Sequence, residues 1–128
     1  MILALKDLRM KNKKGVIAWP LHPAMRKVKI EAGRVWEEFG QKCVITSGLE
    51  GEHGDGSLHP FGCALDFRTR YFKKGVPETV AKKLKKRLGP DYVVICHGKH
   101  HIHVGYNKIL EAWKKELNKI EGGKDYEQ

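Results

Sequence analysis

The sequence predicts a small single domain of the α+β class, with a mainly antiparallel sheet flanked by helices. The chain has 128 residues, which is room for one hydrophobic core, so we expect one domain over residues 1–128. Hydrophobic residues make up 41% and charged residues 31%, the profile of a folded chain rather than a disordered one. Strand and helix patterns follow one another without a regular βαβ order, which favours antiparallel pairing.

Helical periodicity indicates three segments. In residues 24–39 apolar side chains recur at helical spacing, and Gly40 ends the run. Pro77 begins a second helix, over residues 77–88, that the following Gly-Pro pair stops. A third helix is expected over about residues 108–120, before a polar tail.

Short apolar runs indicate four strands, at residues 42–46, 63–67, 92–96 and 101–106. A glycine-rich loop over residues 47–57 follows the first of them. Before the first helix, the basic run 11–14 is predicted as a loop, and residues 16–19 as a short strand or an arm.

The composition of the chain indicates where the protein is made and which kind of partner it binds. The apolar stretches are too short for a membrane span, and the first residues lack a secretory signal, so we expect synthesis in the cytoplasm. A formal charge of +10 favours a polyanionic partner, whether nucleic acid, anionic lipid or anionic cell wall. Three cysteines without a CxxC pair indicate buried, reduced thiols rather than disulfides or a thiolate zinc site.

Histidines are concentrated near the end of the predicted sheet. Four of the seven lie within seven residues: His97, His100, His101 and His103. The last two point to one face of a strand, because side chains alternate with period two. Imidazole and carboxylate are ligands of catalytic zinc. From spacing alone, both a metal site and an ordinary solvated hairpin fit this cluster.

Two motifs add a specific resemblance. Residues 57–66, Ser-Leu-His-Pro-Phe-Gly-Cys-Ala-Leu-Asp, match the pattern S-x-H-x-x-G-x-A-x-D, and residues 101–104 match a later H-x-H strand. Together they resemble the zinc peptidases that include D-alanyl-D-alanine carboxypeptidases and L-alanyl-D-glutamate endopeptidases, among them phage endolysins. The resemblance covers about residues 44–106 and implies the small α+β fold shared with the hedgehog signalling domain.

The resemblance implies a Zn²⁺ ion bound by His59, Asp66 and His103. Two neutral imidazoles and one carboxylate would leave the metal with a net positive charge, which acidifies a water molecule in the fourth position. Gly62 is expected to let the chain bend between the histidine and the strand that carries the carboxylate.

The general base departs from the family pattern. Relatives usually carry Glu or Asp three residues before the last zinc ligand, where this chain has His100. We expect this histidine to be the base, since a neutral imidazole accepts a proton near working pH. His101 is the next candidate, as base or oxyanion partner, and His97 the third. The arginine that often follows the Ser-Gly pair is also missing.

Three further side chains are candidates for substrate binding. Ser57 and His53 belong to the glycine-rich loop, and each is also explained as an ordinary loop residue. Arg68, with Arg70 beside it, follows the predicted strand 63–67 and can bind a substrate carboxylate with both guanidinium nitrogens. A solvated basic edge is the alternative for this pair.

Taken together, the residues and the resemblance predict a monomeric zinc metallopeptidase that hydrolyses peptidoglycan stem peptides. The positive charge suits the anionic cell wall, and a chain without a signal sequence suits a phage lysis enzyme that reaches the wall after release. One alternative is a zinc-binding structural module of the same fold that has lost its catalytic carboxylate. Another is a basic metal-dependent nuclease whose lysine-rich helix 77–88 tracks phosphates.

Overall fold

The computed structural model describes residues 10–50, 59, 62–108, 116 and 119. Most of the predicted helix 108–120 and the loop residues 51–58 lie outside the described residues. The described part holds five strands: β1 (Met10–Asn12), β2 (Cys43–Ser47), β3 (Ala64–Arg68), β4 (Tyr92–Cys96) and β5 (His101–Tyr106). Two helices, α2 (Met25–Glu38) and α3 (Val76–Leu88), complete it.

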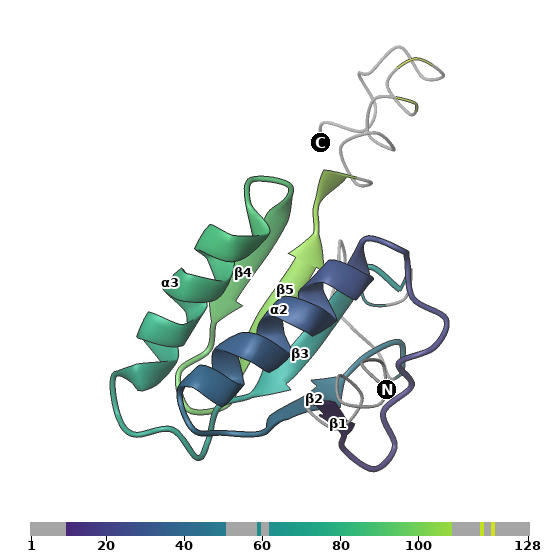
Figure 1. The fold of residues 1–128 in the computed structure, drawn as a ribbon. Helices are drawn as coiled ribbons and strands as arrows, with labels where there is room; N and C mark the ends of the chain where they lie inside the picture. The colour runs from purple at the N-terminus through teal and green to yellow at the C-terminus, as the bar shows by residue number, and fades with distance from the viewer. Residues whose placement is uncertain (1–9, 51–58, 60–61, 109–115, 117–118, 120–128) are drawn as a thin grey trace, which may run out of the picture.

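The strands form one sheet in the order β1-β2-β3-β5-β4 (Figure 1). The β1–β2 pair is parallel, and the other three pairs are antiparallel. The prediction of an α+β domain with a mainly antiparallel sheet is therefore confirmed. Within the described residues, no helix is long and apolar enough to cross a membrane.

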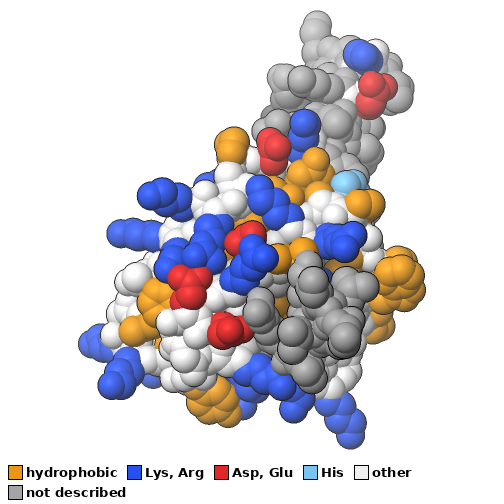
Figure 2. Space-filling view, in the orientation of Figure 1, with side chains coloured by type: hydrophobic (Ala, Val, Ile, Leu, Met, Phe, Trp, Pro, Cys, Tyr) orange, Lys and Arg blue, Asp and Glu red, His pale blue; other side chains and the backbone are white. Residues whose placement is uncertain are grey.

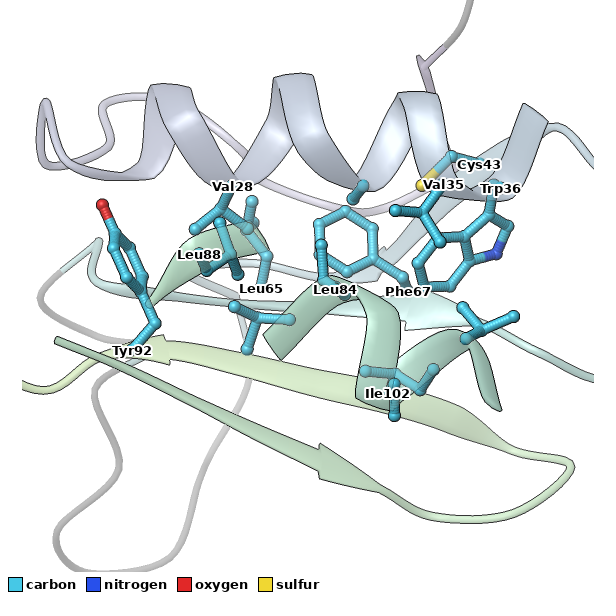
Figure 3. Packing of buried hydrophobic residues seen from close by; sticks show 14 of the residues in the cluster. Val28, Val35, Trp36, Cys43, Leu65, Phe67, Leu84, Leu88, Tyr92 and Ile102 are labelled. Carbon is cyan, nitrogen blue, oxygen red and sulfur yellow. The ribbon is translucent and has the colours of Figure 1, made fainter. Parts of the chain in front are cut away.

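Both helices cover the same face of the sheet (Figure 1). Each contributes a stripe of apolar side chains at helical spacing, including Val28, Val35 and Trp36 of α2 and Leu84 and Leu88 of α3. These side chains pack on apolar residues of the sheet to form the core (Figure 3). Burial of this apolar surface is the main source of stability.

Side chains along β3 and β5 point alternately to the hydrophobic core and to the opposite face of the sheet. Leu65 and Phe67 of β3, with Ile102 of β5, lie fully buried beneath the helices (Figure 3). Asp66 and His103 occupy the intervening positions and therefore point to the opposite face. The packing of the core thus fixes which face carries the polar residues.

The first part of the chain differs from the prediction. Residues 10–12 form β1 where a loop was expected from residue 11, because they pair with β2 at the sheet edge. Residues 16–19 form an arm, one of the two predicted alternatives, and the Ile17 carbonyl accepts a hydrogen bond from the Leu49 N–H. Cys96 is only half-buried, whereas a buried thiol was expected. The remaining helix and strand boundaries agree with prediction to within one residue.

Candidate metal site

Three side chains with metal-binding atoms converge on the sheet face opposite the helices: His59, Asp66 and His103. The Asp66 Oδ1 atom lies 2.9 Å from Nδ1 of His103 and 3.2 Å from Nε2 of His59. The two histidine nitrogens are themselves 3.2 Å apart. These ligand atoms all lie within 4.8 Å of one another, so the three side chains can hold a metal ion.

Sheet register brings two of the three together. Asp66 on β3 and His103 on β5 are direct partners in the antiparallel ladder, although they are 37 residues apart in sequence. Cross-strand partners on one face have neighbouring side chains, so no loop needs to move to join them. The paired strands therefore fix the positions of two of the three side chains.

His59 completes the site from the segment that follows β2. Its side chain is only 2% exposed, and its Nδ1 atom donates a hydrogen bond to the Gly48 carbonyl at 2.8 Å. A carbonyl oxygen can only accept, so this bond places a proton on Nδ1 and leaves Nε2 as the atom that faces Asp66. Metal-binding histidines are commonly oriented in this way by a backbone carbonyl.

Two glycines allow the chain to pack closely around His59. A Cβ atom on Gly48 would lie 2.2 Å from the Ile17 carbonyl oxygen, and one on Gly62 would lie 2.9 Å from the Pro20 carbonyl oxygen. Gly62 also has a φ of +70°, which favours glycine. The arm before α2 is thus pressed against both ends of the segment that carries His59.

Glu50 binds the same arm through hydrogen bonds. Its carboxylate accepts hydrogen bonds from the backbone N–H groups of Ile17, at 2.8 Å, and Gly48, at 2.9 Å. Burial would raise the pKa of Glu50, but these backbone hydrogen bonds outweigh it and lower the pKa. Glu50 therefore acts as an ionised structural anchor beside the site.

The electrostatics of the cluster favour a cation. Burial would raise the pKa of Asp66, but hydrogen bonds from His103 and His59 hold it well below its usual range. Burial would lower the pKa of His59, but the hydrogen bond and charge of Asp66 raise it. Since Nδ1 of His59 already donates to Gly48, its Nε2 can approach Asp66 favourably only with a proton or a metal ion between them.

The structure separates the three histidines that were candidates for the base. His101 lies on the same face of β5 as His103, with its Nε2 atom 3.7 Å from Oδ2 of Asp66. His97 stacks on His101, with ring centroids 4.6 Å apart. His100 is exposed in the β4–β5 turn and shares with His101 the lining of a surface hollow. Of these three, His101 has the direct contact with the cluster.

Of the three candidates for substrate binding, the structure describes only Arg68. Arg68 and Arg70 line the same hollow as His101, on one side of the cluster. Ser57 and His53 lie outside the described residues. Sequence reasoning missed Gly48 as the partner of His59 and Glu50 as the anchor of the arm, because neither pairing follows a local pattern.

Comparisons with protein-family models, curated proteins and solved structures found no match for this chain. The class that the fold and the cluster define is therefore an α+β domain with a site that can hold a metal ion.

Proposed function

We propose that this protein is a zinc-dependent peptidase that hydrolyses stem-peptide bonds of peptidoglycan, and that it has the hedgehog/DD-peptidase fold. The observation that carries the proposal is the convergence of His59, Asp66 and His103, the three residues that the peptidase motifs select. The two motifs lie far apart in the sequence, yet their metal-binding atoms lie within 4.8 Å of one another. A chance match of two short patterns would give no reason for these residues to be neighbours.

The donor set suits zinc. Two neutral imidazoles and one carboxylate are a common protein ligand set of catalytic zinc, which keeps further positions open for water and substrate. When bound, the metal supplies a Lewis acid that polarises a carbonyl group and acidifies water. The hydrogen bond from His59 to Gly48 orients the ligand, and the Asp66 carboxylate provides the negative charge that a divalent ion needs.

His101 is the side chain best placed to accept the proton from water and deliver it to the leaving amine. Burial lowers its pKa, and the neighbouring imidazoles lower it further, against the attraction of Asp66. His101 is therefore neutral near pH 7 and able to act as a base. We propose it in this role in preference to His100, which lacks a contact with the cluster.

A zinc-binding module without catalytic activity is the second candidate. It is favoured by the histidine at position 100, where related peptidases carry a carboxylate, and by the use of Glu50 as a backbone anchor. Both functions predict metal binding, so only an assay of catalysis separates them.

The test is hydrolysis of purified peptidoglycan, followed by the appearance of new amino groups, with and without a metal chelator. Zinc-dependent release that stops in chelator and returns on adding zinc supports the peptidase. Stoichiometric zinc without release supports the module. A parallel assay on DNA and RNA tests the nuclease, and cleavage there with intact peptidoglycan would overturn the proposal.

A further inference from the structure

One surface hollow adjoins the candidate metal site through His101, and a second hollow shares two lining residues with the first. The first, of about 550 Å³, is lined by His101 of the site, by Thr46 and by five further residues: Lys13, Arg68, Arg70, Lys99 and His100. The second, of about 500 Å³, shares Arg70 and Lys99 with the first and continues along Lys73 and Lys74. Because Arg70 and Lys99 line both, the two hollows are neighbours, and together they make a track that leads away from His101.

The track is strongly cationic. Six side chains carry its charge: Lys13, Arg68, Arg70, Lys73, Lys74 and Lys99. None of the six lies within ion-pair distance of a carboxylate in the part of the chain that the structure describes. Among the lining residues, the only carboxylate is Glu78 in the second hollow. The track therefore presents a field that attracts anions.

The lysine-rich helix α3 is different, although its composition looks equally basic. Lys83 pairs with Glu38, and Arg87 reaches the Glu38 carboxylate at 2.6 Å. Acidic and basic side chains accordingly lie next to one another over the helices (Figure 2). Lys82 and Lys86 are exposed on this helix, outside the track, and supply a matched control.

The two walls of the track are held in place. The buried Thr69 hydroxyl donates a hydrogen bond to the Gly98 carbonyl at 2.7 Å, which joins the end of β3 to the β4–β5 turn. Trp36 Nε1 donates to the Arg68 carbonyl at 2.9 Å from the core side. The backbone that carries the cations is therefore preorganised, which reduces the entropy cost of binding.

Aromatic groups along the track are already engaged. The guanidinium groups of Arg68 and Arg70 lie over the Tyr71 ring, 4.8 and 5.0 Å from its centroid. Phe72, which lines the second hollow, packs against Trp36 of the core. Binding of single-stranded nucleic acid uses aromatic faces on which bases stack. Phe72 packs against the core, and Tyr71, although 59% exposed, lines neither hollow.

We infer that this track binds a phosphodiester polymer that carries no bases, such as a poly(glycerol phosphate) chain of a cell wall. The cationic side chains are spread over two neighbouring hollows. A chain of repeated phosphates can contact several of them at once, whereas a ligand with one carboxylate cannot. The choice of a wall polymer rests on the proposed function, whereas the anionic character of the ligand rests on the track alone. Bound polymer would hold the metal site next to the wall.

The experiment measures the affinity of a fluorescently labelled poly(glycerol phosphate) oligomer by anisotropy, at 50 and 200 mM salt and with chelator present. We expect Arg70→Gln/Lys99→Gln to weaken binding about tenfold and to reduce the salt dependence, since two phosphate contacts are lost. Lys82→Gln/Lys86→Gln removes the same charge and should change affinity less than about twofold. Arg70→Lys/Lys99→Arg, which keeps the charge, should retain most of the affinity.

Each other outcome overturns the inference. Equal losses in the two Gln variants would mean that only net charge matters, and binding abolished by chelator would place the polymer on the metal. Tighter, Arg70-dependent binding of a labelled oligothymidylate would identify the ligand as nucleic acid. Because no turnover is measured, a lack of peptidase activity would contradict the proposed function without affecting this result.

Discussion

Asp66 and His103 are direct partners across β3 and β5, and their side chains meet with Oδ1 of the carboxylate 2.9 Å from Nδ1 of the imidazole. This pair forms the part of the candidate metal site that the sheet itself makes. His59 reaches the pair from outside the sheet, held by its hydrogen bond to Gly48.

Replacing Asp66 by Asn should abolish stoichiometric metal binding while preserving the shape of the side chain. The amide has no charge to balance a divalent ion. We therefore expect zinc to raise the melting temperature of the unaltered protein and not that of the variant. Elemental analysis and thermal unfolding with and without zinc provide the measurement. His97→Ala, outside the ligand set, should still bind one ion. Full zinc occupancy in Asp66→Asn would refute the ligand assignment.

Gly48→Ala should weaken metal binding indirectly, through the orientation of His59. The new Cβ would meet the Ile17 carbonyl at 2.2 Å, so the backbone that orients His59 has to shift. We expect the free energy of unfolding to fall by about 1–3 kcal/mol and metal affinity to fall about 10- to 100-fold. Denaturant unfolding and a competitive zinc titration measure the two effects.

Gly40→Ala is the control for this change. Gly40 has a positive φ, +77°, and nothing lies within 4 Å of an added Cβ. Its replacement should lower stability through backbone strain and leave zinc affinity unchanged. Equal losses of zinc affinity in both variants would show that Gly48 has no special role in orienting His59.

Glu50→Gln should lower stability in a manner that depends on pH. The pKa of Glu50 is lower in the folded chain than its ordinary value of 4.5, so its ionised form stabilises the fold. That contribution is present in full above pH 4.5 and is lost as the pH falls through the folded pKa.

We expect Glu50→Gln to be less stable by about 1 kcal/mol near neutral pH, after allowance for solvent screening. The difference should shrink below the ordinary pKa. Urea unfolding of both proteins in chelator, between pH 3 and 7, measures it. A difference that stays constant over this range would mean that the carboxylate charge is not what holds the arm.

His101→Ala should retain zinc and lose about two to four orders of magnitude in turnover, as expected for a general base. His100→Ala should have a much smaller effect, contrary to the expectation from its sequence position. Because the base must be neutral, the proposed activity of the unaltered protein should rise with pH and level off near or below the ordinary histidine pKa of 6.5. Loss of turnover in His100→Ala alone would return the role to that residue.

Local patterns in the sequence were enough to predict most of the fold. The helical stripes of α2 and α3 and the apolar runs of the four antiparallel strands are recorded in neighbouring residues, and their boundaries agree with the structure to within one residue. The motif S-x-H-x-x-G-x-A-x-D with the later H-x-H also identified the three side chains that converge. Residue type and spacing carry this information directly.

Other features depended on tertiary structure. The strand β1 forms through pairing with β2, and the contacts of Ile17 with Leu49 and Glu50 join residues more than thirty positions apart, without a periodic signal. Sequence order placed His100 at the usual position of the base, whereas the period of β5 turns His101 toward Asp66. The sequence determined which residues can bind a metal, and long-range packing decided which neighbours orient them, because those contacts exist only in the folded chain.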